Sequence, residues 1–224
     1  MKKLALFVFA TALIIGLIFS SGCGFNFINL SGIEGSGTSK SEQRDVSGFS
    51  KIDAGGAINL EIAIQDNYGV TIEADDNLLQ HIKTEVNGDT LKIYSEGKIS
   101  TKTKINVKIS MPELSDLDIS GASTARVADA RFDALELTAS GASKITINGT
   151  AASVKADASG ASSIDAEKLA VENADVNSSG ASKVIVAPSN DLNADASGAS
   201  SVYYTGEPKN IKQDSSGASS IKKK

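Results

Sequence analysis

Apolar and polar residues alternate with a period of two over most of the chain from residue 46 onward. In one stretch the apolar positions are Leu135, Leu137 and Ala139, and in the next they are Ile145 and Ile147. A period of two over four to seven residues is typical of a β-strand with one buried face. The 3.6-residue period of an amphipathic helix is absent, so the pattern predicts strands.

A tetrapeptide, Ser-Gly-Ala-Ser, separates these paired stretches and returns at spacings of 20, 19, 20, 18 and 19 residues. Periods of about 20 residues indicate a solenoid, in which each unit buries its apolar edge against its neighbours. Asn148-Gly149 and Pro188-Ser189-Asn190-Asp191 have the composition of turns that close the circuit. The sequence therefore predicts an all-β solenoid with rungs of about 19–20 residues, each made of strand, corner, strand and return turn. The six copies begin at Ser120, Ser140, Ser159, Ser179, Ser197 and Ser216.

We assign the tetrapeptide to the corner, because Gly has permissive backbone angles and Ala and Ser leave room for a sharp bend. Columns of Ser hydroxyls are then expected to hydrogen-bond along the stack. The functional alternative is a Ser-lined binding strip, and six identical corners favour the structural interpretation. The last rung ends at Ile221 before Lys222-Lys223-Lys224, and lysines commonly protect an exposed strand edge.

Residues 46–117 keep the strand period but lack the tetrapeptide, so we expect them to cap the repeats of 118–221 within one continuous body, 46–221. Asp75 to Ile82 is expected to form a helical turn that Asp75 or Asp76 caps. Asn87-Gly88-Asp89 predicts a hairpin turn. The expected strands are Phe49–Ile52, Ile58–Ile64, Val70–Ala74, Leu91–Tyr94 and Lys104–Ser110.

The first 22 residues have the pattern of an export signal. Lys2-Lys3 is followed by an uncharged apolar run from Leu4 to Phe19, which is short for a membrane span. Cys23, the only cysteine, comes directly after small residues and resembles the lipidated Cys of the bacterial lipoprotein lipobox, although Ser20 stands where Leu is usual. We predict lipidation of Cys23; the alternative is an ordinary secretory signal. Residues 23–45, rich in Ser and Gly, are predicted to be a flexible tether.

The charge balance excludes some functions. The formal net charge is −5, and it becomes −7 without the two leader lysines. An acidic chain with no basic stripe argues against nucleic-acid binding. His81 is the only His, so catalytic triads and multi-His metal sites are impossible within one chain. Trp is absent and Tyr203-Tyr204 is the only aromatic pair, which supplies a sugar-stacking groove poorly; we predict no enzyme activity and no cofactor.

One polar column remains as a weak metal candidate. The residue two positions before each tetrapeptide is Asp, Thr or Asn, so matching rungs would align these oxygens. Calcium is bound by such oxygen ligands. The alternative is a solvated polar face, with Lys155 and Lys212 offsetting the charge. The column is Asp118, Thr138, Asp157, Asn177, Asp195 and Asp214, and its candidate calcium ligands are Asp157, Asn177, Asp195 and Asp214.

A series of motifs resembles the family named "putative auto-transporter adhesin, head GIN domain". The resemblance covers about residues 46–221 and implies a right-handed β-helix-like fold in bacterial envelope proteins, often lipoproteins. It offers no catalytic residues. The motifs are Gly48-Phe49-Ser50-Lys51-Ile52, Gly56-Ala57-Ile58-Asn59-Leu60-Glu61-Ile62, Gly88-Asp89-Thr90-Leu91-Lys92-Ile93, Val107-Lys108-Ile109-Ser110-Met111-Pro112-Glu113-Leu114, and the Ser-Gly-Ala repeats.

The sequence therefore predicts a non-catalytic, membrane-anchored lipoprotein of the cell envelope, on the outer membrane in a Gram-negative cell. Its rigid surface would bind an extracellular or periplasmic protein or glycan. A structural or self-assembling protein, stacked end to end through open edges, is the alternative, and a glycan-active enzyme is a third possibility.

Overall fold

The computed structural model describes residues 32–224, apart from the side chains of residues 129–130. Within this range the chain is all-β, as predicted, with a single 3-10 turn, η1 (Leu79–His81). Fifteen strands form one sheet, and β1 and β8 form a separate pair. The strands are β1 (Ile33–Glu34), β2 (Ser39–Arg44), β3 (Lys51–Gly56), β4 (Ile58–Ile64), β5 (Gly69–Asp75), β6 (Ile82–Asn87), β7 (Thr90–Ser95), β8 (Ile99–Ser100), β9 (Ile105–Met111), β10 (Asp116–Gly121), β11 (Thr124–Ala139), β12 (Lys144–Ala158), β13 (Ser163–Ser178), β14 (Lys183–Ala196), β15 (Ser201–Tyr204), β16 (Asn210–Ser215) and β17 (Ser220–Lys223).

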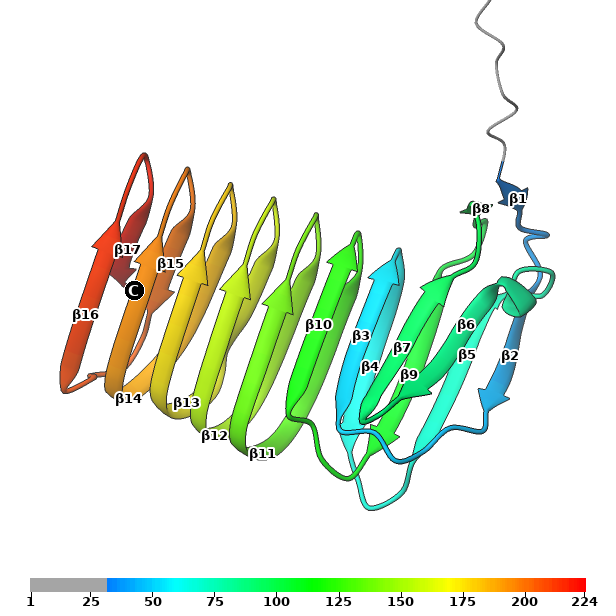
Figure 1. The fold of residues 1–224 in the computed structure, drawn as a ribbon, viewed down its shortest axis with the longest axis horizontal. Coiled ribbons are helices and arrows are strands. Elements are labelled where there is room, and N and C mark those ends of the chain that lie inside the picture. The colour runs from blue at the N-terminus through cyan, green and yellow to red at the C-terminus, as the bar shows by residue number, and fades with distance from the viewer. Residues whose placement is uncertain (1–31) are drawn as a thin grey trace, which may run out of the picture. The chain divides into compact units, whose positions relative to one another are not determined.

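Consecutive repeats pair in parallel and in register. Leu137 of β11 lies opposite Ala156 of β12, which lies opposite Val176 of β13. The same offset of one repeat continues through β14, β15, β16 and β17. Figure 1 shows the strands as a row in which each repeat bends at a tip. The apolar positions point inward, so the aligned strands enclose a core of Ile, Val, Leu and Ala side chains.

The tips from the one after β10 onward are the six Ser-Gly-Ala-Ser tetrapeptides, as predicted. The Gly has a φ between 71° and 75° in all six copies, a left-handed conformation that only Gly adopts readily. The six corners also stack closely: a Cβ added to Gly160 would lie 2.7 Å from the carbonyl oxygen of Gly141. The same oxygen accepts a 2.7 Å hydrogen bond from the N–H of Ala161. Gly is therefore required here both by its backbone angle and by the close approach of the preceding repeat.

The last Ser of the tetrapeptide is buried in the first five copies. The hydroxyl of Ser162 donates to the carbonyl oxygen of Ala139 at 2.9 Å, and that of Ser200 donates to Ser178 at 2.8 Å. The acceptor is in each case the residue immediately before the tetrapeptide of the preceding repeat. The Ser columns thus hydrogen-bond along the stack, mainly to backbone carbonyls and not to each other.

The predicted return turns are not separate turns. Each long strand runs from one tetrapeptide to the next, and the pairing shifts register between Val127 and Ala130 of β11 and between Thr146 and Asn148 of β12. These shifts are β-bulges, which bend a strand without ending it. The variation in repeat length is absorbed there, because the pairing near the tetrapeptides keeps its register.

The N-terminal half supplies two further repeats. β3, which ends in Gly55-Gly56, and β4 pair in parallel with β10 and β11, so that Gly56 lies opposite Gly121. β7 and β9 pair in parallel with the other edges of β3 and β4. The spatial order along the row is therefore β7 and β9, then β3 and β4, then β10 and β11, which is not the order in the sequence.

Antiparallel strands cover the end of this row. β6 and β7 form the predicted hairpin, with Asn87 opposite Thr90, and β5 pairs with β9. The helical turn predicted for Asp75–Ile82 is shorter, and neither Asp caps it: its N-cap is Leu78, without a side-chain hydrogen bond. Asp75 instead ends β5 and serves a different purpose, described below.

The tether predicted for residues 23–45 is wrong in its second part. Ile33–Glu34 pairs with β8, and β2 (Ser39–Arg44) pairs antiparallel with residues 70–75 of β5. The segment looked like a linker because β2 is an edge strand, whose polar residues face water while its backbone satisfies the open edge of β5. Residues 23–31 lie outside the described range.

Candidate functional site

The register aligns outward side chains into columns on two faces. The first face is formed by β7, β3, β10, the C-terminal halves of β11 to β14, and β16. We call it the acidic face, because its outward columns contain nine carboxylates and four lysines: Asp53, Asp116, Asp118, Glu136, Asp157, Asp175, Asp191, Asp195 and Asp214, with Lys51, Lys92, Lys155 and Lys212. The second face is formed by β5, β9, β4, the N-terminal halves of β11 to β14, β15 and β17.

The predicted polar column lies on the acidic face with its members opposite one another. Asp118, Thr138, Asp157, Asn177, Asp195 and Asp214 are each one repeat apart. The side-chain amide of Asn177 donates to the carboxylate of Asp157 at 2.7 Å, so the amide already relieves part of the repulsion that a bound cation would relieve. In the part of the chain that the structure describes, no three acidic, His or Cys residues are grouped so as to hold a metal ion. The structure thus aligns the candidate calcium ligands but adds no support for a metal.

Charges on this face influence one another. Burial raises the pKa of Asp116 and of Asp118, and nearby carboxylates, Glu136 for the first and Asp53 for the second, raise each pKa further. Farther along the row Lys155 lies 2.5 Å from Glu136 and 3.2 Å from Asp157, and these contacts raise its own pKa. Negative charge on this face is therefore compensated unevenly: Lys92 pairs with Asp53 and Lys155 with Glu136 and Asp157, whereas Asp118 has no ion-pair partner among the described residues.

A hollow of about 460 Å³ opens on the second face. Its outward row consists of small residues, because Gly69, Ser110, Ala63 and Ala128 lie opposite one another on four adjacent strands. The next row, two residues nearer the corners, has longer side chains: Thr71, Lys108, Glu61 and Arg126. The hollow is thus a gap over small side chains beside a wall of alternating charge.

A second hollow, of about 320 Å³, adjoins the first and shares Arg126 and Ala128 with it. It continues over β12 and β13, where Thr146, Asp165, Glu167 and Lys168 line it. Arg126 is exposed, and among the described residues it makes neither an ion pair nor a side-chain hydrogen bond. We call the two hollows together the Arg126 groove.

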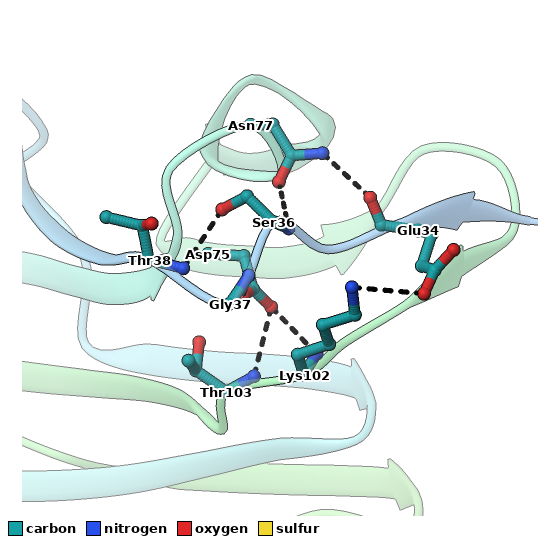
Figure 2. Close-up of polar contacts among 8 residues, drawn as sticks. All are labelled: Glu34, Ser36, Gly37, Thr38, Asp75, Asn77, Lys102 and Thr103. Carbon is teal, nitrogen blue, oxygen red and sulfur yellow. Dashed lines mark hydrogen bonds and ion pairs between the residues drawn. The ribbon is translucent and has the colours of Figure 1, made fainter.

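A buried carboxylate holds the N-terminal segment on the body (Figure 2). Asp75 is fully buried, and it accepts hydrogen bonds from the backbone N–H groups of Gly37 at 2.7 Å, Lys102 at 2.9 Å and Thr103 at 3.1 Å. Burial raises the pKa of Asp75, but these three bonds outweigh burial and hold its pKa below the ordinary value. Asp75 therefore joins the segment after the predicted anchor to the loop between β8 and β9.

The neighbouring side chains reinforce this junction. Asn77 accepts from the N–H of Ser36 at 2.8 Å and donates to the carbonyl of Glu34 at 2.8 Å, while Lys102 pairs with the carboxylate of Glu34 at 3.1 Å. Gly35 is buried so close to the carboxylate of Asp75 that an added Cβ would lie 2.3 Å from its oxygen. The arrangement is structural, since its donors and acceptors are used within the protein.

Other predicted residues fall outside these surfaces. Cys23, the predicted lipidation site, lies outside the described residues. His81 is half-buried at the end of η1 and is not part of either face. The sequence interpretation missed Arg126, because the wall of the groove comes from β9, β4 and β11, whose order in space differs from their order in the chain. No helix within residues 32–224 is long and apolar enough to cross a membrane.

The arrangement defines an all-β protein in which parallel repeats are capped by antiparallel strands. The chain belongs to the family described as "putative auto-transporter adhesin, head GIN domain", whose model matches residues 48–208. No curated protein matches the chain in sequence.

Solved structures share the fold at low identity. A "putative adhesin" from Bacteroides fragilis NCTC 9343 is 22% identical, with a TM-score of 0.70 over 86% of this chain and 100% of its own. A "putative lipid binding protein" from Parabacteroides distasonis ATCC 8503 is 19% identical, with a TM-score of 0.56 over 86% and 99%. A "putative adhesin" from Parabacteroides merdae ATCC 43184 is 17% identical, with a TM-score of 0.56 over 85% and 98%. At these identities the likeness concerns the fold alone.

Proposed function

We propose that this protein is a non-catalytic lipoprotein of the cell envelope that uses the faces of a right-handed β-solenoid to adhere to an external partner. The observation that carries the proposal is the in-register parallel pairing of the repeats. This pairing sets outward side chains in straight columns on two flat faces, which suits binding over an extended area. Family membership points the same way, because the family takes its name from adhesins.

A solenoid is supported by the corners and by the connections. Each corner stacks on the preceding one, and each strand reaches its parallel neighbour only through the opposite side of the repeat. Connections between parallel strands of one sheet are right-handed in about 98% of cases, which favours the right-handed form. Residues 46–117 would form its capped N-terminal part and residues 118–221 its regular repeats.

Membrane attachment through Cys23 completes the proposal. Lipid chains partition into a bilayer with about 0.8 kcal/mol per buried CH₂, so a lipidated N-terminus would hold the body at the membrane, the outer one in a Gram-negative envelope. Residues 1–22 would be removed as the signal. Expression with a radiolabelled fatty acid tests this step: the full chain should incorporate label, and Cys23→Ser should not.

Adhesion is tested by coating beads with the full chain and counting beads retained on host cells, on other bacteria and on extracellular matrix. Retention above that of beads coated with an unrelated lipoprotein supports the proposal. The absence of retention on all three surfaces contradicts it.

Self-assembly is the alternative function, and the last repeat bears on it. In the described chain β16 pairs only with β14, and β17 only with β15, which leaves one edge of each strand open. However, the inward positions of this repeat include Gln213, Ser215 and Lys223, where the preceding repeat has Ala194, Ala196 and Tyr204. Ile211 and Ile221 keep two inward positions of this repeat apolar, and the three polar ones disfavour end-to-end stacking. Concentration-dependent filaments in light scattering would support the alternative.

A further inference from the structure

We infer that the Arg126 groove binds a glycan that carries spaced carboxylate groups, such as a polymer in which uronic acids alternate with neutral sugars. This inference rests on the proposed adhesive function and assigns it a site and a ligand class. The groove is lined by residues of six neighbouring strands, β5, β9, β4, β11, β12 and β13.

Three charged groups of the groove, Glu61, Lys108 and Arg126, are not used within the protein. Of the others, Glu167 pairs with Lys224 at 2.7 Å, and the carboxylate of Asp165 accepts a hydrogen bond from the N–H of Glu167 at 3.3 Å. Lys108 and Arg126 lie two strands apart with Glu61 between them, yet the described residues contain no ion pair within 4.0 Å that involves any of the three. The guanidinium of Arg126 therefore keeps all its donors free, and its planar shape suits two parallel hydrogen bonds to a carboxylate. Its place between the two hollows puts that contact at the centre of the groove.

The shape of the groove suits sugar rings. Gly69, Ser110, Ala63 and Ala128 make a floor of small side chains, on which the C–H face of a ring can lie. Adjacent strands are about 4.7–4.9 Å apart. The polar groups therefore recur at intervals comparable to the length of one sugar residue in an extended chain.

The remaining polar groups favour a glycan over an acidic peptide or a nucleic acid. Glu61 and Asp165 are acceptors, which sugar hydroxyls can satisfy by donating hydrogen bonds. A ligand with a negative charge at every residue would meet repulsion from both. A peptide cannot be added as a further strand either, because β9, β4 and β11 are paired on both sides here. A ligand with many hydroxyls and spaced carboxylates fits both features.

The test measures binding of the full chain, kept in a mild detergent, to three uronate oligosaccharides by isothermal titration calorimetry. The probes are oligosaccharides of hyaluronan, unsulfated chondroitin and heparosan, in which a uronic acid alternates with an N-acetylated sugar, and each is compared with its carboxyl-reduced form. The variant is Arg126→Gln, and the matched control is Lys144→Gln. Lys144 is exposed on the same face but lines neither hollow. Because Arg126 is exposed and unpaired, both variants should keep the thermal stability of the parent chain.

We expect at least one uronate to bind, and Arg126→Gln to weaken its affinity about tenfold or more. A change of this size corresponds to the loss of one or two charged hydrogen bonds. Lys144→Gln should leave the affinity unchanged, and the carboxyl-reduced probe should bind as weakly to the parent as the uronate binds to Arg126→Gln. Equal binding by parent and Arg126→Gln overturns the inference, as does Arg126-dependent binding of poly-glutamate in place of every uronate. If none of the three uronates binds but the coated beads adhere, the proposed site is wrong and the adhesive function stands. If no uronate binds and the beads do not adhere, both the site and the adhesive function are overturned.

Discussion

Replacing Gly160 by Ala tests whether the stacked corners hold the repeats together. Gly160 has a φ of 71°, and a left-handed backbone costs an L-residue about 1–2 kcal/mol. Part of this cost is offset, because Ala restricts the unfolded chain by about 0.4–1 kcal/mol relative to Gly. Backbone strain alone therefore predicts a loss of no more than about 1.5 kcal/mol.

The close approach adds a second cost. The new Cβ would lie 2.7 Å from the carbonyl oxygen of Gly141, so an ordinary contact requires the two repeats to separate by roughly 0.8 Å. The hydrogen bond from Ala161 to the same oxygen would lengthen by a similar amount, and each ladder bond lost costs about 0.5–1.5 kcal/mol. With one or two bonds disrupted, we expect Gly160→Ala to reduce the free energy of unfolding by roughly 2–4 kcal/mol in total.

The assay is urea denaturation followed by far-UV circular dichroism, with Gly97→Ala as the matched control. Gly97 has a φ of 78°, but an added Cβ would have no atom within 4 Å, so this variant measures the backbone cost alone. A Gly217→Ala variant should cost less than Gly160→Ala, because its contact is longer, 2.9 Å, and lies on the last repeat. If Gly160→Ala destabilises the chain no more than Gly97→Ala, close stacking does not stabilise the repeats and the reasoning is refuted.

Four further predictions address single contacts. Ser162→Ala removes a buried hydroxyl that donates to Ala139, and it should cost about 1 kcal/mol in urea denaturation, whereas the exposed Ser159→Ala should cost less than about 0.5 kcal/mol. Asp75→Asn should expose the segment before β3 to limited proteolysis while the repeats stay protected. Because folding lowers the pKa of Asp75, the carboxylate of the parent chain should hold this segment fully on the body above about pH 4, and the segment should be released as the pH falls through the lowered pKa. Asp118→Asn should raise the melting temperature at pH 7, because burial and other carboxylates raise the pKa of Asp118 and its charged form is therefore unfavourable in the folded state. The gain should vanish at pH values where the carboxyl group of the parent chain is protonated. A gain that persists there contradicts this cause. The melting temperature of the full chain should not change in millimolar calcium, since the outward Asp and Asn column is already bridged by an amide, and a clear upward shift would establish a calcium site.

The regular repeats could be predicted from the sequence because their signals are local. Ser-Gly-Ala-Ser fixes each corner through one backbone angle, and the period of two fixes which side chains enter the core. The hairpin at Gly88-Asp89 was predictable for the same reason, since a two-residue turn sets its own register.

The N-terminal repeats escaped prediction because their partners are distant in sequence. Gly56 stacks under Gly121 although a long insertion separates them, and the first Ser of the corner is replaced there by Gly55. A signal was nevertheless present: Ile52-Asp53-Ala54-Gly55-Gly56-Ala57 repeats the pattern of Leu117-Asp118-Ile119-Ser120-Gly121-Ala122. Composition misled us at β2, since a strand whose only neighbour is β5 can be as polar as a linker. The Arg126 groove depends on the same distant pairings and therefore could not be assembled from local patterns.

The exchanged order of the N-terminal repeats has a consequence for how the protein folds. As the chain is made from its N-terminus, β3 and β4 are the first strands of the parallel row to appear. Both of their neighbours come later: β7 and β9 on one side, and β10 and β11 on the other. The first repeat must therefore wait, with both edges open, until residues up to about Ala128 are available. Such long loop closures slow folding and expose edges to other chains in the meantime. Once β10 and β11 have docked, each later repeat needs only the one before it, so the rate-limiting step belongs to the first 128 residues and the remaining repeats add by short local steps.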